Sequence, residues 1–145
     1  MIALVQRVSE ASVRVDGQVV GTIGPGVLAF VGMVHTDSEA SGERLLSRVL
    51  QYRLFADAEG RMNRSVQDTG GGLLLVPQFT LAADTSRGNR AGFSTAAAPA
   101  QAAALFAALV ALARSRHVPL ACGVFGASMQ VALVNDGPVT FWLES

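Results

Sequence analysis

The chain has 145 residues, of which half are apolar and 15% are charged, so its composition excludes a disordered protein and predicts one globular domain over residues 1–145. Eleven arginines balance eleven carboxylates, and lysine is absent. Because the chain lacks the basic excess of proteins that coat long stretches of nucleic acid, we expect no DNA partner, while recognition of an RNA end stays open. The few charges leave apolar surface to be covered, which favours a two-fold homodimer.

The cysteine count and the N-terminal pattern favour a cytoplasmic protein. Cys122 stands alone, which excludes an intramolecular disulfide and a cysteine-based zinc site. Arg7 and Glu10 interrupt the apolar N-terminal segment, unlike a signal peptide. The longest uncharged stretch, residues 91–113, is rich in alanine and contains Pro99, so it predicts a buried helix and no membrane partner. Neither a metal-ligand spacing nor a cofactor motif is present, so we expect no metal and no cofactor.

The first third of the chain predicts β-structure. Asp16 and Gly17 form a pair that tolerates the positive φ angles of a tight hairpin turn, and Gly24-Pro25-Gly26 predicts a second turn. The strands predicted around these turns are residues 2–8, 11–15, 18–23 and 27–34.

The rest of the chain predicts two main helices and further strands. Leucines and valines at helical spacing predict a helix over residues 39–53, with Thr36, Asp37 or Ser38 as its N-cap. Pro99 predicts the start of a second helix that ends near Arg116. Residues 55–70 and 82–98 predict irregular loops, and further strands are predicted at 73–76, 120–125, 129–134 and 139–143. The fold class is therefore α/β, a single domain with a mixed, largely antiparallel sheet and two main helices.

The common catalytic constellations are missing from the sequence. Neither His35 nor His117 lies in a recognisable metal or nucleophile motif, and we expect a surface or capping role for His117. Cys122 within a strand is most simply a small buried hydrophobe rather than a reactive thiol. The glycine-rich turns lack the Lys and Ser/Thr of a phosphate-binding loop.

Two short segments remain as candidates for chemistry. In Pro77-Gln78-Phe79-Thr80-Leu81, polar side chains alternate with apolar ones at the end of a buried strand, where side chains commonly project into a site. Asn135-Asp136-Gly137-Pro138-Val139-Thr140 links two predicted C-terminal strands. Taken alone, the first is an ordinary strand edge and the second an ordinary turn.

Together with two more motifs, these segments resemble the D-aminoacyl-tRNA deacylase family. The motifs follow the family's order along the whole chain: Gln78-Phe79-Thr80-Leu81, then Arg87-Gly88-Asn89-Arg90 with Phe93, then Phe125-Gly126-Ala127 with Met129, and last Asn135-Asp136-Gly137-Pro138-Val139-Thr140. The opening residues Val5-Gln6-Arg7-Val8 also fit the family's start. Four ordered motifs are a specific signal, whereas a Gly-Pro pair alone carries none.

The resemblance implies an esterase that removes D-amino acids, and also glycine, from mischarged tRNA. It implies a homodimer whose sites lie at the interface, with Gly137 and Pro138, joined by a cis peptide bond, inserted into the partner's site. Main-chain carbonyl oxygens there hold the α-amino group and leave no room for an L side chain. The cis form is cheap only before proline, and glycine lets the backbone approach a ligand closely, so the sequence is consistent with this role.

The resemblance also explains why the sequence contains no catalytic triad. The terminal adenosine's own 2′-hydroxyl assists hydrolysis, and backbone N–H groups near Gln78, Phe79 and Thr80 stabilise the developing negative charge. We therefore assign these three residues to the catalytic wall, with Thr80 as a positioning residue, because no base is placed beside it for a nucleophilic role. Phe125 and Met129 are assigned to the adenine pocket. Arg7, Gly137 and Pro138 are the remaining substrate-binding candidates.

The sequence departs from the family pattern at a few positions. Pro77 stands where the family commonly has Ser, which removes a hydroxyl and a backbone N–H. Since lysine is absent, Arg61, Arg64, Arg87 and Arg90 are the candidates for phosphate contacts, with solvated surface arginines as the alternative. Two other hypotheses stay open: a non-catalytic module that binds the tRNA end, in which Pro77 has abolished hydrolysis, and a purely structural dimerisation protein.

Overall fold

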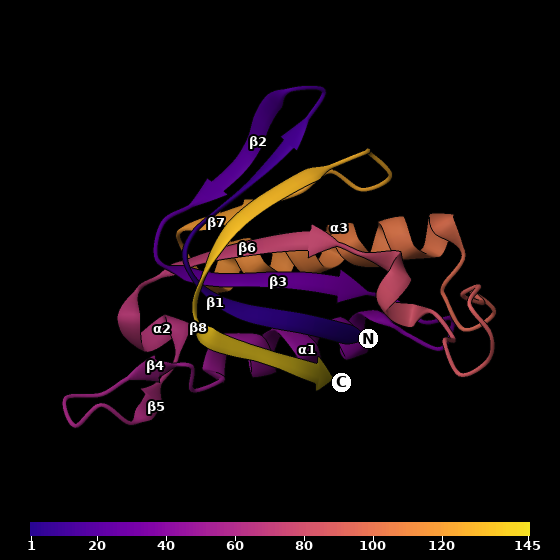
Figure 1. Cartoon of the computed structure of the whole chain (residues 1–145). Coiled ribbons are helices and arrows are strands. Elements are labelled where there is room, and N and C mark those ends of the chain that lie inside the picture. The colour runs from indigo at the N-terminus through magenta and orange to yellow at the C-terminus, as the bar shows by residue number, and fades with distance from the viewer.

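The long strand β1 (Ile2–Val15) organises the sheet in the computed structural model, which describes residues 1–145 (Figure 1). β1 pairs antiparallel with β2 (Gln18–Ile23), with β3 (Gly26–Gly32) and with the C-terminal strand β8 (Gln130–Glu144). The order continues from β3 through β6 (Gly72–Pro77) to β7 (Leu120–Cys122), and these pairings are parallel. The predicted mixed, largely antiparallel sheet in an α/β domain is confirmed.

The two predicted main helices cover one face of the sheet, and Figure 1 shows both behind the strands. α1 (Glu39–Gln51) begins after the N-cap Ser38 and buries Leu45, Leu46, Val49 and Leu50. α3 (Pro99–Arg116) begins with proline at its first position, where the missing N–H is not needed. These helices pack on the alternate β1 and β3 residues that face them, which builds the larger of two apolar cores. No helix has both the length and the apolar character needed to cross a membrane.

The second core forms because the sheet curls. In Figure 1, the β1–β2 hairpin and the first half of β8 rise away from the plane of the other strands. Val13 of β1 and Ile23 of β2 thereby pack over Leu28 and Leu74, on the face that the helices leave free. The turn between β1 and β2 has Asp16 and Gly17 at φ angles of 48° and 79°, as the hairpin prediction requires.

Several sequence-based expectations differ from the structure. The strands expected at residues 2–8 and 11–15 are one continuous strand, β1, because β8 pairs with it along its length. The strand expected at 120–125 ends at Cys122. The expected irregular loop at residues 55–70 contains a small hairpin, β4 (Phe55–Ala56) with β5 (Met62–Arg64), and a one-turn helix, α2 (Val66–Thr69). The two C-terminal strands expected at 129–134 and 139–143 are one strand, β8, because the continuous β1 offers pairing partners to both halves. Of the two roles expected for His117, capping of α3 is confirmed and a surface position is wrong: the ring is buried, and its Nε2 lies 2.8 Å from the carbonyl oxygen of Gly71.

Candidate active site

A cavity of about 490 Å³ lies at the C-terminal end of β6. It brings together four of the predicted site residues, Gln78, Phe79, Phe125 and Met129. The other residues that line it are apolar or glycine: Val76, Pro77, Ala97, Pro99, Ala102, Gly126, Ala127 and Val131. No titratable side chain lines the cavity, so its walls offer shape, apolar surface, one amide side chain and the main chain.

The segment that follows β6 contains Gln78, Phe79 and Thr80, the residues that the resemblance assigns to catalysis. The backbone N–H of Gln78 donates to the carbonyl oxygen of Val31 at 2.8 Å, which extends the pairing with β3 one step beyond Pro77. The chain then turns into a short 3-10 helix, η1 (Phe79–Ala82), whose first hydrogen bond joins Leu81 N to Gln78 O at 3.3 Å. The N–H groups of Phe79 and Thr80 precede that bond and have no partner within the helix.

Thr80 does not line the cavity but is coupled to a residue that does. The side-chain amide of Gln78 donates to the Thr80 hydroxyl. With no histidine or carboxylate among the lining residues, nothing there can take a proton from Thr80. The geometry therefore fits a positioning residue and not a nucleophile.

The connection between β7 and β8 supplies the opposite wall. The thioether sulfur of Met129 accepts a hydrogen bond from the backbone N–H of Val124 at 3.4 Å. A Cβ at Gly123 would lie 2.8 Å from that sulfur, so any other residue there would displace the Met129 side chain. The ring of Phe125 lies 6.3 Å from that of Phe106 on α3, which anchors this wall to the larger core.

Gly137 and Pro138 lie in a bulge of β8. Thr140 pairs with Gln6 and Asn135 with Val8, so a single β1 residue, Arg7, lies opposite four residues of β8. Asp136, Gly137 and Pro138 are exposed, and the peptide bond between the last two is cis. The predicted turn between two strands is therefore a projection from one strand.

Arg7 and Asn135 fix this bulge from both sides. The Nε of Arg7 donates to the carbonyl oxygen of Asp136 at 2.8 Å, and Nη1 donates to that of Leu54 at 2.6 Å. The side-chain amide of Asn135 donates to the carbonyl oxygens of Arg7 at 2.9 Å and Val139 at 3.1 Å. Arg7 thus lies beside the Gly-Pro pair and not in the cavity.

Within one chain, the bulge and the cavity lie at opposite ends of the sheet. Val8, beside the bulge, pairs with Gly26 at the start of β3, and Gly26 pairs with Gly72 at the start of β6. The cavity lies beyond Pro77, where β6 ends. At 3.3 Å per residue, the two positions are separated by roughly 15 Å along the strand direction alone.

The predicted functional loop passes the cavity and carries two free arginines. Ala97 N donates to Met33 O at 3.0 Å, and Asp84 and Gly92 exchange two backbone hydrogen bonds at 2.8 and 2.9 Å, which hold the base of the loop. Hydrogen bonds from the hydroxyl and backbone N–H of Ser86 lower the pKa of Asp84 below its ordinary value. Arg87 and Arg90 at the tip are exposed, and neither forms an ion pair.

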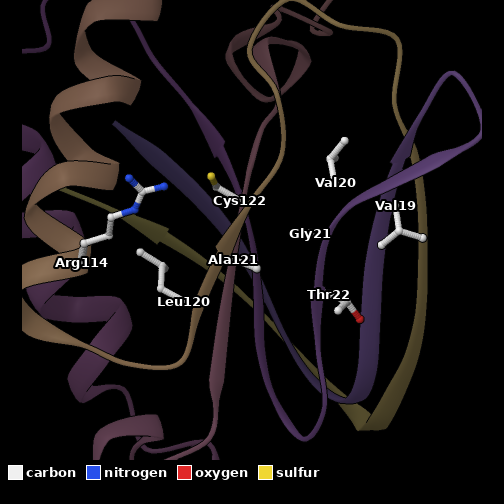
Figure 2. Close-up of a pocket in the computed structure, with 8 residues that line it drawn as sticks. All are labelled: Val19, Val20, Gly21, Thr22, Arg114, Leu120, Ala121 and Cys122. Carbon is white, nitrogen blue, oxygen red and sulfur yellow. The ribbon is translucent and has the colours of Figure 1, made fainter.

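A second cavity, of about 350 Å³, contains none of the predicted site residues. Figure 2 shows it between β2, which contributes Val19 to Thr22, and β7, which contributes Leu120 to Cys122. Arg114 extends into it from the end of α3 and is its only charged side chain (Figure 2). The lining contains no histidine or carboxylate; its other side chains that could take part in chemistry are the hydroxyl of Thr22 and the thiol of Cys122, which is half-buried.

Comparison with known proteins decides the family. The family model described as "D-Tyr-tRNA(Tyr) deacylase" matches residues 4–144. The chain belongs to this family. It is 67% identical to the D-aminoacyl-tRNA deacylase of Thioalkalivibrio sulfidiphilus over 99% of this chain and 97% of that protein. It is 63% identical to the D-aminoacyl-tRNA deacylase of Azotobacter vinelandii over the full length of both. The resemblance inferred from the four motifs is confirmed, and with it the prediction of a deacylase enzyme.

Two solved structures show the same fold as this deacylase-family chain. One, described as "c-Myc DNA Unwinding Element Binding Protein", superposes with a TM-score of 0.95 at 37% identity and covers 100% of this chain and 99% of its own. The other, described as "Structural Analysis of a probable eukaryotic D-amino acid tRNA deacylase", has a TM-score of 0.86 at 15% identity and covers 99% of this chain and 98% of its own. At that identity the second likeness shows the fold alone.

The family motifs do not reveal every residue that shapes this site. Asn135 belongs to the last motif, but the sequence assigns it no role, although its amide bridges both edges of the bulge. Ala97, Pro99 and Ala102 complete the cavity from the start of α3. Their small side chains carry no chemical signal, and only the packing of α3 against the end of β6 brings them to the site.

Proposed function

We propose that the chain hydrolyses the ester bond that joins a D-amino acid, or glycine mischarged on tRNA-Ala, to the terminal adenosine of tRNA. The observation that carries this proposal is the cavity beside the free N–H groups of Phe79 and Thr80 in a chain of the deacylase family. Water attacks the ester carbonyl carbon, and the bond between that carbon and the ribose oxygen breaks. The ribose oxygen takes up a proton lost by the water, and the products are the free amino acid and tRNA.

The main chain at the end of β6 performs the electrostatic part of this reaction. The N–H groups of Phe79 and Thr80 donate to the carbonyl oxygen as it gains negative charge, which stabilises the transition state. Gln78 holds the Thr80 hydroxyl and so fixes this turn. The substrate's own 2′-hydroxyl assists the attacking water, as the family resemblance implies, and cavity walls without a titratable group are consistent with this role. The reaction then needs no metal or cofactor.

The apolar wall of the cavity takes the adenine of the terminal nucleoside. Phe125 offers a ring face for stacking, and Met129 offers a polarisable sulfur at a fixed position. The wall is backed by α3 through Phe106, so it is formed before the substrate binds. Binding energy at the adenine then positions the ester against the η1 turn.

The site is completed by a second copy of the chain. Gly137 and Pro138 lie at the far end of the sheet from their own cavity and are exposed, so they can reach a cavity only in a partner. The sheet face without helices offers the surface for pairing: Trp142, Leu4 and Phe30 are neighbours in register there, and Trp142 is 50% exposed. An apolar row of this kind is typical of a homodimer interface.

The inserted Gly-Pro pair excludes L-amino acids by steric contact. Its carbonyl oxygens accept hydrogen bonds from the α-amino group of the substrate, so a side chain of L configuration points into the backbone of the bulge. A D side chain, or none, avoids it. Selection by exclusion makes the enzyme tolerant of different D side chains.

The partners that follow from this proposal are the aminoacylated 3′ end of tRNA and a second copy of the chain, in the cytoplasm. Arg87 and Arg90 are free to contact phosphates beside the cavity. One solved relative is named for binding a DNA element. With eleven basic and eleven acidic residues, this chain lacks the charge to coat a duplex, and the absence of a DNA or membrane partner stays a prediction.

One experiment tests the activity against the binding-module alternative, which the proline at position 77 favours. The purified protein is incubated with D-Tyr-tRNA and L-Tyr-tRNA in parallel, and release of tyrosine is followed. We expect rapid loss of the D ester with the L ester intact. Binding of tRNA with neither ester cleaved supports a non-catalytic module, and cleavage of both esters contradicts the steric filter.

A further inference from the structure

Two exposed aromatic rings stand together at the mouth of the cavity. Phe79 on η1 is 60% exposed and Phe93 in the loop after it is 42% exposed. Their ring centroids are 5.1 Å apart with an angle of 47° between the planes. Neither ring belongs to a core cluster, so the pair contributes little to the stability of the single chain and leaves a large apolar surface in water.

The backbone on both sides of Phe93 is held in place. Gly92, directly before it, exchanges two hydrogen bonds with Asp84. After it, Ala96 N donates to Phe93 O at 3.1 Å, and the Thr95 hydroxyl donates to the carbonyl oxygen of Ala82 at the end of η1. The ring is therefore presented on an ordered segment, which favours a binding role because little order is lost when a ligand arrives.

The charges around the pair indicate what kind of ligand it meets. Arg87 and Arg90, at the tip of the same loop, have no acidic partner. The nearby carboxylate of Asp84 is already occupied by the backbone N–H of Ser86 at 2.9 Å. Exposed aromatic rings beside unpaired arginines are the combination that binds single-stranded nucleic acid, since rings stack on bases and guanidinium groups contact phosphates.

We propose that Phe79 and Phe93 form a stacking platform for the base of the unpaired nucleotide that precedes the terminal adenosine. This inference rests on the proposed function, because it places that adenosine in the cavity. Phe79 lines the cavity and also contacts Phe93, so the platform begins where the cavity ends. The platform thereby binds an unpaired nucleotide outside the reaction site. It accepts any base, because every base has a flat face that can stack on an aromatic ring.

Equilibrium binding of uncharged ligands tests the platform without relying on hydrolysis. The dissociation constants of adenosine and of the trinucleotide CCA are measured by calorimetry. The dissociation constant of adenosine divided by that of CCA gives the gain in affinity from the two preceding nucleotides. We expect Phe93→Ala to lower this ratio about tenfold, as for loss of one base–aromatic stack. Phe93→Tyr keeps an aromatic ring and should keep the ratio.

Val118→Ala is the matched control. Val118 is 77% exposed but lies beyond the far end of α3, about 27 Å along the helix from the cavity. The Val118→Ala variant should leave the ratio unchanged.

If Phe93 has only a structural role, Phe93→Ala weakens the binding of adenosine and of CCA equally, and that result overturns the proposal. An unchanged ratio in Phe93→Ala also overturns it. Dissociation of the dimer in that variant overturns it as well, because it would mean that a second copy of the chain covers the ring.

Failure of the proposed function looks different from failure of the platform. If the native protein cleaves no D-aminoacyl ester but binds CCA more tightly than adenosine through Phe93, the hydrolase proposal is wrong and the platform stands. If the native protein cleaves D-aminoacyl-adenosine as efficiently as D-aminoacyl-tRNA, the preceding nucleotides are not bound and the platform is overturned.

Discussion

The Nε of Arg7 lies 2.8 Å from the carbonyl oxygen of Asp136, the residue directly before Gly137. The same guanidinium reaches the carboxylate of Asp136 at 3.1 Å and the carbonyl oxygen of Leu54 at 2.6 Å. Arg7 therefore ties the projecting bulge of β8 to the middle of β1 and to the segment after α1. The arginine of the family's opening motif supports the Gly-Pro pair and does not line the cavity.

Replacing Arg7 should loosen the bulge. Arg7→Met retains the apolar stem but removes charge-assisted hydrogen bonds, and we expect a loss of about 2 kcal/mol in the free energy of unfolding. Rejection of L-aminoacyl-tRNA should weaken at the same time, because the Gly-Pro carbonyls are no longer held in one place. Urea unfolding and the ratio of D to L hydrolysis measure the two effects.

Arg14→Met is the control on the same strand, because the Arg14 guanidinium is exposed and forms no ion pair. It should leave both quantities unchanged. Equal effects of the two substitutions would show that Arg7 acts through its charge alone.

Gly137→Ala should abolish most of the activity. A Cβ at this position would lie 2.0 Å from Val139 N and 3.1 Å from the Asn135 side chain, so the bulge must change shape. We expect deacylation to fall about 100-fold, as for other misplacements of a reacting group by an ångström. Gly24→Ala, at a turn glycine with no atom within 4 Å of an added Cβ, should retain full activity. Native rates in Gly137→Ala would mean that the bulge does not enter a site.

The departure at Pro77 should be tolerated. The backbone N–H of Gln78 keeps its hydrogen bond to Val31 whatever side chain precedes it, and the proposed N–H donors belong to Phe79 and Thr80. We expect Pro77→Ser to change kcat by less than about threefold, whereas Gln78→Ala, which frees the Thr80 hydroxyl, should lower it about tenfold. A large gain of activity in Pro77→Ser would show that the hydroxyl takes part in the reaction. Single-turnover kinetics on D-Tyr-tRNA separates these outcomes.

The sequence predicts locally encoded features well. Asp16-Gly17 specifies a hairpin turn by its tolerance of positive φ, and Pro99 specifies the first residue of α3. The bulge in β8 cannot be predicted from the sequence, because Asn-Asp-Gly-Pro has the composition of a turn and only pairing with β1, more than 120 residues away, keeps it within a strand. The distance between the Gly-Pro pair and the cavity depends on that same non-local register, so no motif could predict it.

The β4–β5 hairpin should lose order at acid pH. Hydrogen bonds from the Asn63 amide and from the backbone N–H groups of Arg61 and Glu59 hold the pKa of Asp57 below its ordinary value of 3.8. A carboxylate with a lowered pKa stabilises its surroundings above the unfolded-state pKa, and this stabilisation is lost as pH falls through the lower folded-state pKa.

The Asp57 carboxyl resonance in an acid titration by NMR measures this pKa. Asn63→Ala should raise it toward the ordinary value, since the largest cause of the shift is removed. Gln67→Ala, on the exposed side of α2, should leave it where it is. A pKa that does not move in Asn63→Ala would contradict this assignment.

The central claim is that each active site combines the cavity of one copy with the Gly137–Pro138 pair of the other, and mixed dimers test it most directly. Gly137→Ala distorts the Gly-Pro bulge and Phe125→Ala removes one aromatic ring from the cavity wall, so each variant alone should be nearly inactive. Co-produced with different tags and purified as mixed dimers, the two chains should recover about half of the native rate on D-Tyr-tRNA, because one of the two sites is intact. Mixed dimers as inactive as either parent would contradict the claim.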